Sequence, residues 1–279
     1  MECRLKRTRV HYEARGEGRS LLALHGFTLD HRVMVEALEP AFRKRAGWRR
    51  FYPDLPGMGQ SEAPDWIASQ DDMLEVLVEL VDRLMPGQRF CVVGLSWGGF
   101  LAQGLVHRLA DRMDGLCLIV PSMGPAGTRD LPARRVLHAE PIDFGDTSAE
   151  DVASFKETAV VQTQEQFAAW ERTILPAVKA ADPNLAARLQ RNYAFSFDPT
   201  ALAGPFDKPA LFLHGRQDNA CGYRDAWKVI ESYPRATYAV LDRVGHGLES
   251  EAPRLLEALV RDWLDRIEEE SADRPAALG

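Results

Sequence analysis

The sequence predicts an α/β fold, in which an open, doubly wound and mostly parallel sheet carries a block of helices inserted between two core strands. Three observations support this prediction. Short apolar runs recur along the chain without polar alternation, which is typical of parallel strands covered on both faces. Amphipathic helical patterns separate these runs, as right-handed crossovers between parallel strands require. One long stretch between two of the runs contains helical patterns alone.

The strands are expected where apolar runs end in glycine or a small polar residue. Two early and more polar segments, 4–8 and 11–14, are expected to pair as an antiparallel hairpin at the sheet edge. The predicted core strands lie within residues 21–26, 50–57, 90–96, 115–122, 209–218 and 237–246.

Two helices of the core show clear patterns. Residues 73–84 place their apolar side chains on one face, and Ser69 with Asp72 three residues later forms a variant of the capping box before them. A second apolar stripe follows Pro253 and consists of Leu256, Leu259, Val260, Trp263 and Ile267.

The region from 123 to 205 interrupts the alternation of strands and helices. It shows amphipathic helical stretches at about 149–162, 164–179 and 183–193 and no convincing core strand. Ligands of open α/β sheets bind at the carboxyl ends of the strands, where an insertion of this size would form a roof. We therefore expect a core of residues 1–122 and 206–270, a helical cap of residues 123–205, and a flexible tail at 271–279.

Composition excludes several classes of partner. The chain has 279 residues, of which 46% are hydrophobic, and a net charge of -7 without a basic stripe, which argues against nucleic acid. The basic stretch 43–50 is interpreted as a solvated loop. No apolar run approaches the roughly 18 residues that cross a bilayer, and no signal peptide is evident. Four cysteines without a CxxC pair predict reduced thiols and a cytoplasmic protein, with Cys91 and Cys117 buried in strands.

A serine stands between glycines where a strand is expected to turn into a helix. The stretch Gly94-Leu95-Ser96-Trp97-Gly98 is a G-x-S-x-G pattern in that context. Such a turn exposes the hydroxyl beside a helix N-terminus, whose free N–H groups favour a developing negative charge. A glycine-rich turn with an incidental serine is the alternative, so a base, an orienting acid and an oxyanion site must be sought elsewhere.

These groups occur at the ends of other predicted strands. His246, between two glycines after the last strand, is the candidate base, and Asp218, at the end of the preceding strand, is the candidate acid that orients it. The backbone N–H groups of Phe27 and Trp97 are the candidate oxyanion donors.

Competing assignments are less favourable. Asp242 is expected to pair locally, Asp54 to fix its own loop, and His214 to be a core histidine. The other histidines considered lack a strand-end position: His11, His31, His107 and His138. No His, Cys, Asp or Glu group has the spacing of metal ligands, so we expect neither a metal nor a cofactor.

The sequence resembles the α/β-hydrolase superfamily in the stretches LHGFT, YPDLPGMGQSEAP, VVGLSWGGFLAQ, LHGRQD and GHGLESEAP. The resemblance implies that Ser96 is the nucleophile, Asp218 the acid and His246 the base, with Phe27 and Trp97 as oxyanion donors. In that superfamily, haloalkane dehalogenases and epoxide hydrolases use aspartate as the nucleophile. The serine at position 96 therefore argues against both activities.

The stretch GLSWGG is also similar to the elbow of prolyl aminopeptidases, whose cap holds the substrate amino group with carboxylates. Glu157, Glu165 and Glu171 are candidates for that role, although solvent-facing positions explain them more simply. Several cap aromatics suggest an apolar acyl pocket or the packing of the cap itself: Phe155, Phe167, Trp170, Tyr193, Phe195 and Phe197.

The expected function is that of a serine hydrolase, carboxylesterase-like, which cleaves a small ester, thioester or lactone through an acyl-enzyme. Hydrolysis of a carbon–carbon bond and prolyl-type aminopeptidase action are alternatives that use the same triad. A slow-turnover binding protein or receptor is an alternative of another class. The expected partner is a small-molecule acyl substrate, without nucleic acid or membrane, and the chain is expected to be a monomer or a homodimer.

Overall fold

The computed structural model describes residues 1–272 and contains an eight-stranded sheet in the order β1-β2-β4-β3-β5-β6-β9-β10. The first two strands are antiparallel to each other, β2 is antiparallel to β4, and the remaining neighbours are parallel. The predicted doubly wound, mostly parallel α/β architecture is thus confirmed. The strands are β1 (Glu2–Arg4), β2 (Arg9–Arg15), β3 (Arg19–Leu24), β4 (Trp48–Pro53), β5 (Phe90–Leu95), β6 (Met113–Ile119), β9 (Ala210–Gly215) and β10 (Ala236–Leu241).

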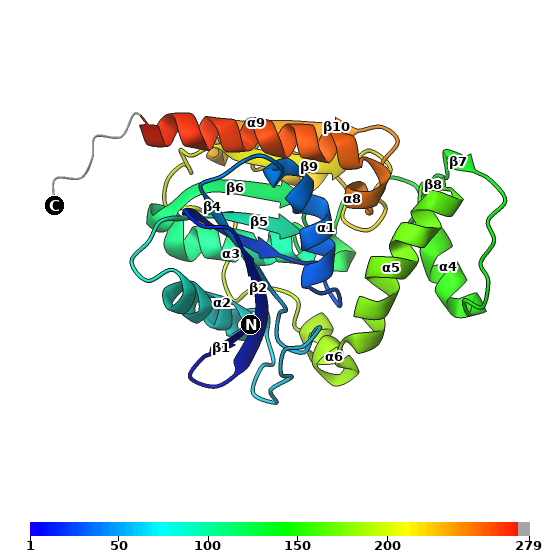
Figure 1. Cartoon of the computed structure of the whole chain (residues 1–279), viewed down its shortest axis with the longest axis horizontal. Coiled ribbons are helices and arrows are strands. Elements are labelled where there is room, and N and C mark those ends of the chain that lie inside the picture. The colour runs from blue at the N-terminus through cyan, green and yellow to red at the C-terminus, as the bar shows by residue number, and fades with distance from the viewer. Residues whose placement is uncertain (273–279) are drawn as a thin grey trace.

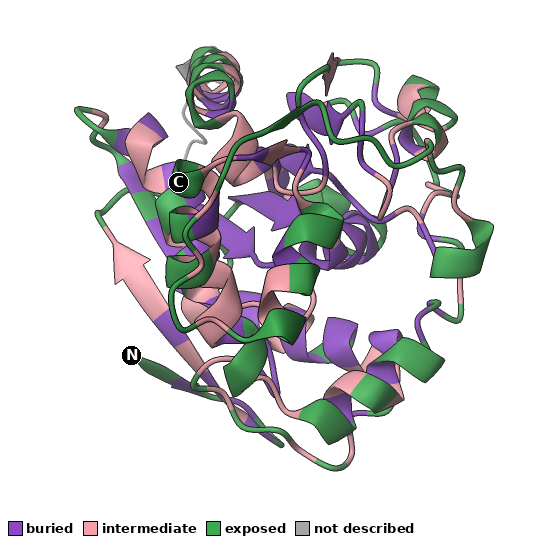
Figure 2. Ribbon diagram, turned by 90° about the vertical axis from the view of Figure 1, so that its right-hand side faces the viewer, coloured by how far each residue is buried: buried purple, intermediate pink, exposed green. Residues whose placement is uncertain are grey.

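Helices cover both faces of this sheet (Figure 1). On one face α1 (His31–Phe42) packs against α9 (Pro253–Ala272), and on the other α2 (Gln70–Leu84) packs against α3 (Trp97–Leu109). Two short helices, α7 (Arg224–Trp227) and α8 (Leu248–Glu251), belong to the connections near the C-terminal strands. The central strands are therefore enclosed between two helical layers, as their burial shows (Figure 2).

The burial of the central strands follows from their composition. Every residue of β5 and β9 is buried, which is why these runs show no polar alternation. Cys91 and Cys117 are buried in β5 and β6, as expected. The predicted capping box is also present: Ser69 Oγ accepts the Asp72 N–H at 3.2 Å and the Asp72 carboxylate accepts the Ser69 N–H at 3.0 Å.

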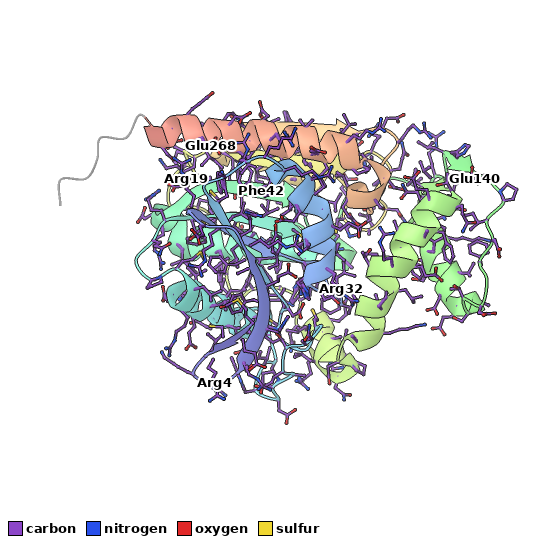
Figure 3. The ribbon with its side chains drawn as sticks, viewed as in Figure 1. Arg4, Arg19, Arg32, Phe42, Glu140 and Glu268 are labelled. Carbon is purple, nitrogen blue, oxygen red and sulfur yellow. The ribbon has the colours of Figure 1, made fainter. Side chains whose placement is uncertain are left out.

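The interpretation of 43–50 as a solvated loop is wrong for its last three residues, which begin β4. Arg50 is buried because its guanidinium pairs with Glu39 at 2.9 Å and donates to the Trp48 carbonyl at 2.8 Å. The Trp48 indole N–H donates to Glu268 of α9 at 2.6 Å, and its ring packs on Phe42 of α1. Figure 3 labels Glu268 and Phe42 on these two helices. The charged Arg50 side chain is tolerated here because each of its three nitrogens donates a hydrogen bond.

A helical insert separates β6, which ends at Ile119, from β9, which begins at Ala210. It contains α4 (Ala149–Thr158), α5 (Gln164–Ala180) and α6 (Pro183–Arg191), close to the predicted helices. A two-residue pairing of β7 (His138–Ala139) with β8 (Val161–Gln162) was not predicted. Figure 1 places the insert beyond one end of the sheet.

The C-terminal helix α9 continues to Ala272, two residues past the predicted end of the core. The remainder of the predicted tail, 273–279, lies outside the described residues. Within residues 1–272, no helix has the length and apolar character needed to span a membrane.

Candidate active site

Ser96 occupies a strained turn between β5 and α3. Its backbone has φ 54° and ψ -114°, a conformation that side chains rarely adopt. A Cβ added at Gly94 would collide with the Gly98 carbonyl, and one added at Gly98 would collide with the Leu24 carbonyl. The two glycines therefore permit the close approach of strand, turn and helix that pushes the serine side chain outward.

The structure brings Ser96, His246 and Asp218 together in one hydrogen-bonded chain. His246 Nε2 lies 2.9 Å from Ser96 Oγ, and His246 Nδ1 lies 3.0 Å from Asp218 Oδ2. The three residues follow β5, β9 and β10, which are parallel strands whose carboxyl ends meet at one edge of the sheet. Strand β10 ends at Leu241, so His246 lies on a loop and not at the tip of a strand.

The surroundings of Asp218 keep it ionised. Burial alone would raise the pKa of this fully buried carboxyl, but the His246 ring and two backbone donors reverse the effect and hold the pKa below its usual value. Its Oδ1 atom accepts the N–H groups of Ala220 and Cys221, both at 2.9 Å. These two hydrogen bonds occupy Oδ1, which leaves Oδ2 to accept the His246 Nδ1–H.

His246 is poised as a proton acceptor. Burial by itself would lower its pKa, but the negative charge of Asp218, its hydrogen bond to the ring and the charge of Glu249 together outweigh burial and raise the pKa above the ordinary value. In the neutral ring, Nδ1–H donates to Asp218 and Nε2 is left to accept the Ser96 hydroxyl proton. The geometry thus suits general-base activation of the serine.

The loop after β3 lies against the serine. A Cβ added at Gly26 would stand 3.5 Å from Ser96 Cβ, and the ring of Phe27 packs edge-on against Trp97 at 5.2 Å. The structure records no acceptor within residues 1–272 for the backbone N–H of Phe27 or Trp97. Both groups are therefore free to donate to an oxyanion, and they remain candidates for that role.

Sequence reasoning missed the part played by His25 in that loop. This fully buried ring donates from Nδ1 to the Gly26 carbonyl at 2.8 Å, while Nε2 accepts the Leu55 N–H at 2.9 Å. Burial lowers its pKa, which keeps the ring in the neutral form that this pattern needs. The sequence shows a histidine before Gly26, but it does not show that the Leu55 N–H after β4 is the hydrogen-bond partner of this ring.

A cavity of about 320 Å³ opens onto Ser96 and His246. The core contributes the loop after β3, part of α1, and α8, and the insert contributes α4 and α5. Its apolar wall on the insert side includes Phe155, Trp170 and Ile174. Its size lies at the lower end of the range for small-molecule sites, roughly 300 to 1,000 Å³.

The other predicted insert residues lie elsewhere. Phe167 packs behind the cavity wall, edge-on to Phe155 at 5.3 Å. Phe195 stacks on Phe100 of α3 at 4.5 Å and attaches the end of the insert to the core, together with its neighbours Tyr193 and Phe197. The three glutamates considered for an amino group are exposed and do not line the cavity: Glu157, Glu165 and Glu171.

Glu251 was also missed, and it joins the insert to the histidine loop. Its Oε1 atom accepts the N–H groups of Val160 at 2.7 Å and Val161 at 3.1 Å, and Oε2 accepts the Gly245 N–H at 2.6 Å. Since Gly245 precedes His246, this carboxylate positions the loop of the candidate base.

The competing residues occupy structural positions. Asp242 is exposed and contacts Gln217. His214 is fully buried and stacks on Tyr238 at 4.8 Å, and burial lowers its pKa to about 4, so the ring is neutral.

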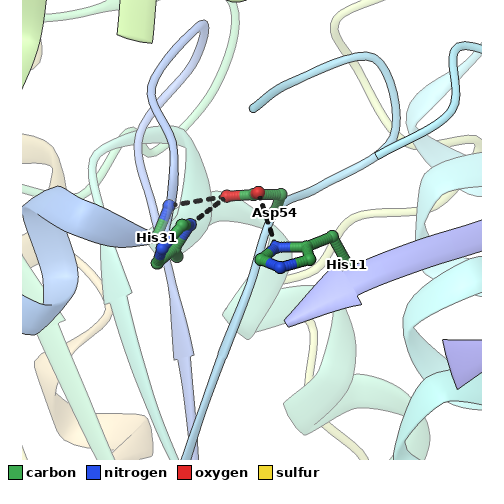
Figure 4. A group of neighbouring side chains, drawn as sticks. All are labelled: His11, His31 and Asp54. Carbon is green, nitrogen blue, oxygen red and sulfur yellow. Dashed lines mark hydrogen bonds and ion pairs between the residues drawn. The ribbon is translucent and has the colours of Figure 1, made fainter. Parts of the chain in front are cut away.

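One cluster has donors of the kind that bind metals, namely His11, His31 and Asp54 (Figure 4). The Asp54 carboxylate accepts His31 Nδ1–H at 2.7 Å and His11 Nδ1–H at 3.0 Å, together with the backbone N–H groups of His31 and Gln60. Each carboxylate oxygen thus accepts two hydrogen bonds. Both oxygens of the Asp54 carboxylate are therefore occupied by hydrogen bonds within the protein, and Asp54 fixes its loop as expected.

Comparison with known proteins agrees with this fold. A family model described as alpha/beta hydrolase fold matches residues 19–253. The chain is 27% identical to haloalkane dehalogenase 2 of Mycobacterium tuberculosis, covering 91% of each chain, and 26% identical to a pimeloyl-[acyl-carrier protein] methyl ester esterase of Nitrosomonas europaea, covering 85% of this chain and 92% of that protein. A crystal structure of an alpha/beta superfamily hydrolase from Oenococcus oeni superimposes with a TM-score of 0.88 at 26% identity, covering 96% of this chain and 99% of the other.

Proposed function

The chain belongs to the α/β-hydrolase fold family and is a hydrolase, and on that premise we propose that it cleaves a small ester, thioester or lactone through an acyl-enzyme on Ser96. One observation carries the proposal: the hydrogen-bonded chain from Ser96 through His246 to Asp218 opens onto a cavity of about 320 Å³. The insert acts as the cap of this cavity.

The reaction proceeds in two halves. His246 Nε2 takes the hydroxyl proton as Ser96 Oγ attacks the carbonyl carbon, and the N–H groups of Phe27 and Trp97 stabilise the tetrahedral oxyanion. The imidazolium, held by Asp218, then protonates the leaving group. Water enters, His246 takes its proton, and collapse of the second tetrahedral intermediate frees the acid and restores the serine. Loss of one oxyanion donor costs about 3 kcal/mol of transition-state stabilisation.

Acyl transfer is favoured over dehalogenation because of the nucleophile. A serine that displaced halide from a saturated carbon would form an ether, which has no carbonyl for water to attack. An ester of Ser96 does have such a carbonyl, and His246 is placed to activate water against it. We therefore do not propose the activity in the dehalogenase relative's name for this chain.

The first test is the intact mass of the protein after brief treatment with a fluorophosphonate. We expect a single adduct on the wild type, none on Ser96→Ala, and much slower labelling of His246→Ala. Ser154→Ala is the matched control, since this serine lines the same cavity without a recorded histidine partner, and it should keep the adduct. An adduct that persists on Ser96→Ala would refute the proposed nucleophile.

A substrate panel then separates the candidate activities. Ester, thioester and lactone hydrolysis supports the proposal, whereas cleavage confined to a β-diketone-like acid supports the carbon–carbon alternative. Cleavage confined to aminoacyl amides with a free amino terminus, with no ester hydrolysed, supports the peptidase alternative. Labelling by the fluorophosphonate with only stoichiometric turnover of the panel favours the binding protein or receptor.

A further inference from the structure

The cavity at Ser96 contains a carboxyl group that the proposed mechanism does not use. Glu249 lies on α8, three residues after His246, and lines the cavity. Its Oε2 atom is buried and has no hydrogen-bond partner within the described chain. The nearby Glu251 differs, because both of its oxygens accept backbone N–H groups. A buried acceptor that is left unpaired is costly, which points to a ligand group that satisfies it.

The charges around the cavity indicate what that group is. Three carboxylates line it, from Glu36, Glu249 and Glu251, and no lysine or arginine is among the described lining residues. Glu36 is exposed and pairs with Arg172, and Glu251 is bound to the backbone. Glu249 is therefore the acid that remains for a ligand, and its surroundings favour a cation.

We propose that Glu249 makes the cavity selective for acyl groups that carry an amino group, whose ammonium N–H donates to Oε2. This inference rests on the proposed function and specifies its substrate class. An acyl chain that ends in carboxylate is disfavoured by repulsion from the same acids, and one that ends in methyl leaves Oε2 unpaired.

The titration of Glu249 agrees with such a role. Burial raises its pKa to about 7, and the charges of Glu251 and Glu36 act in the same direction, while its own backbone N–H and His246 oppose them. Near neutral pH the carboxyl is thus partly protonated, and protonation does not give Oε2 a hydrogen-bond partner. An ammonium group favours the ionised form, displaces that proton to solvent and donates the hydrogen bond that the oxygen lacks.

The test compares methyl esters of equal chain length that end in methyl, hydroxyl, ammonium or carboxylate, in several chain lengths, with hydrolysis followed by mass spectrometry. We expect the ammonium-ended ester to have the highest kcat/KM. The ratio of ammonium-ended to methyl-ended kcat/KM should fall about tenfold in Glu249→Gln, the loss expected for one hydrogen bond between charged groups. Glu249→Leu should reverse the preference toward the methyl end.

Glu165→Gln is the matched control, since this exposed cap carboxylate lies outside the cavity, and the ratio should not change in it. A ratio that stays the same in Glu249→Gln, or that falls equally in Glu165→Gln, would overturn the inference and leave the proposed function intact.

A binding measurement separates this inference from the proposed function. Calorimetry on Ser96→Ala compares a linear alkylammonium with the alcohol and the carboxylate of equal length. Tighter binding of the alkylammonium that is lost in Ser96→Ala/Glu249→Gln supports the inference. If the wild type also hydrolyses no ester of the panel, the proposed function is refuted while the assignment of Glu249 as an ammonium site stands. Equal binding of the three compounds overturns it.

Discussion

Replacing Asp218 by asparagine is the sharpest test of how the site holds its base. The Oδ1 atom accepts two backbone N–H groups and Oδ2 accepts the His246 Nδ1–H. An asparagine keeps only one acceptor oxygen, and the two backbone donors hold it in the Oδ1 position. The amide NH₂ then faces His246 Nδ1, which must become an acceptor. The proton moves to Nε2, and the ring can no longer accept the hydroxyl proton of Ser96.

The wrong tautomer in a serine triad lowers kcat by about 10⁴-fold, and we expect a loss of that order in Asp218→Asn. The assay is the initial rate on a small activated ester together with the rate of fluorophosphonate labelling, which should fall in parallel. Thermal unfolding of the variant checks that the fold persists. Asp242→Asn is the matched control, because that exposed carboxylate does not contact His246, and it should retain wild-type rates.

The same variant changes the pH profile. Asp218 raises the pKa of His246 against the effect of burial, so wild-type activity is lost as pH falls through that raised value. Removal of the charge lowers the pKa of His246, and the acid limb of the residual activity should move to lower pH. Activity within tenfold of wild type, or an acid limb that does not move, would show that Asp218 does not orient the base.

Two further predictions concern residues outside the triad. In Glu251→Gln the amide cannot accept on both sides, so at least one of the three backbone donors loses its partner. The free energy of unfolding should fall by about 1–3 kcal/mol in denaturant titrations, and kcat should fall because the loop at Gly245 shifts. An unchanged kcat would contradict the positioning role. The pKa of His31 is raised chiefly by its hydrogen bond to Asp54. The stability that this interaction contributes is therefore fully present below the unfolded pKa of about 6.5, and it is lost as the pH rises through the pKa of the folded state. The difference in unfolding free energy between wild type and His31→Asn should therefore be larger at about pH 6 than at about pH 9, and equal differences would refute this.

The sequence predicted the sheet and the nucleophile because both leave local patterns. Strands such as β5 and β9, which are buried on both faces, are apolar at nearly every position, with His214 of β9 as an exception, so their runs are visible without any knowledge of neighbours. Ser96 could be located because its two flanking glycines stand within the same five residues, although the contact that excludes a side chain at Gly98 is with the distant Leu24 carbonyl. The three members of the hydrogen-bonded chain follow from the rule that parallel strands end at one edge.

The parts that were missed depend on partners distant in the sequence. Arg50 looked like part of a solvated basic stretch, because its burial depends on Glu39 of α1. His25 and Glu251 act through hydrogen bonds with backbone N–H groups of other loops, and a backbone group has no signature in the sequence. The unpaired Oε2 atom of Glu249 is even harder to predict from the sequence, since it is defined by the lack of a hydrogen-bond partner among the described residues.

The placement of Glu251 connects the helical insert to the loop of the candidate base. One of its oxygens holds Val160 and Val161 of the insert, and the other holds Gly245 beside His246. A displacement of the insert at this point must therefore break these bonds or pull on the loop of the base. Glu249, two residues earlier on the same short helix, lines the cavity. Under the proposed function and the inference for Glu249, a substrate ammonium bound to Glu249 acts on the short helix that also carries Glu251, and through Glu251 on the loop of the candidate base.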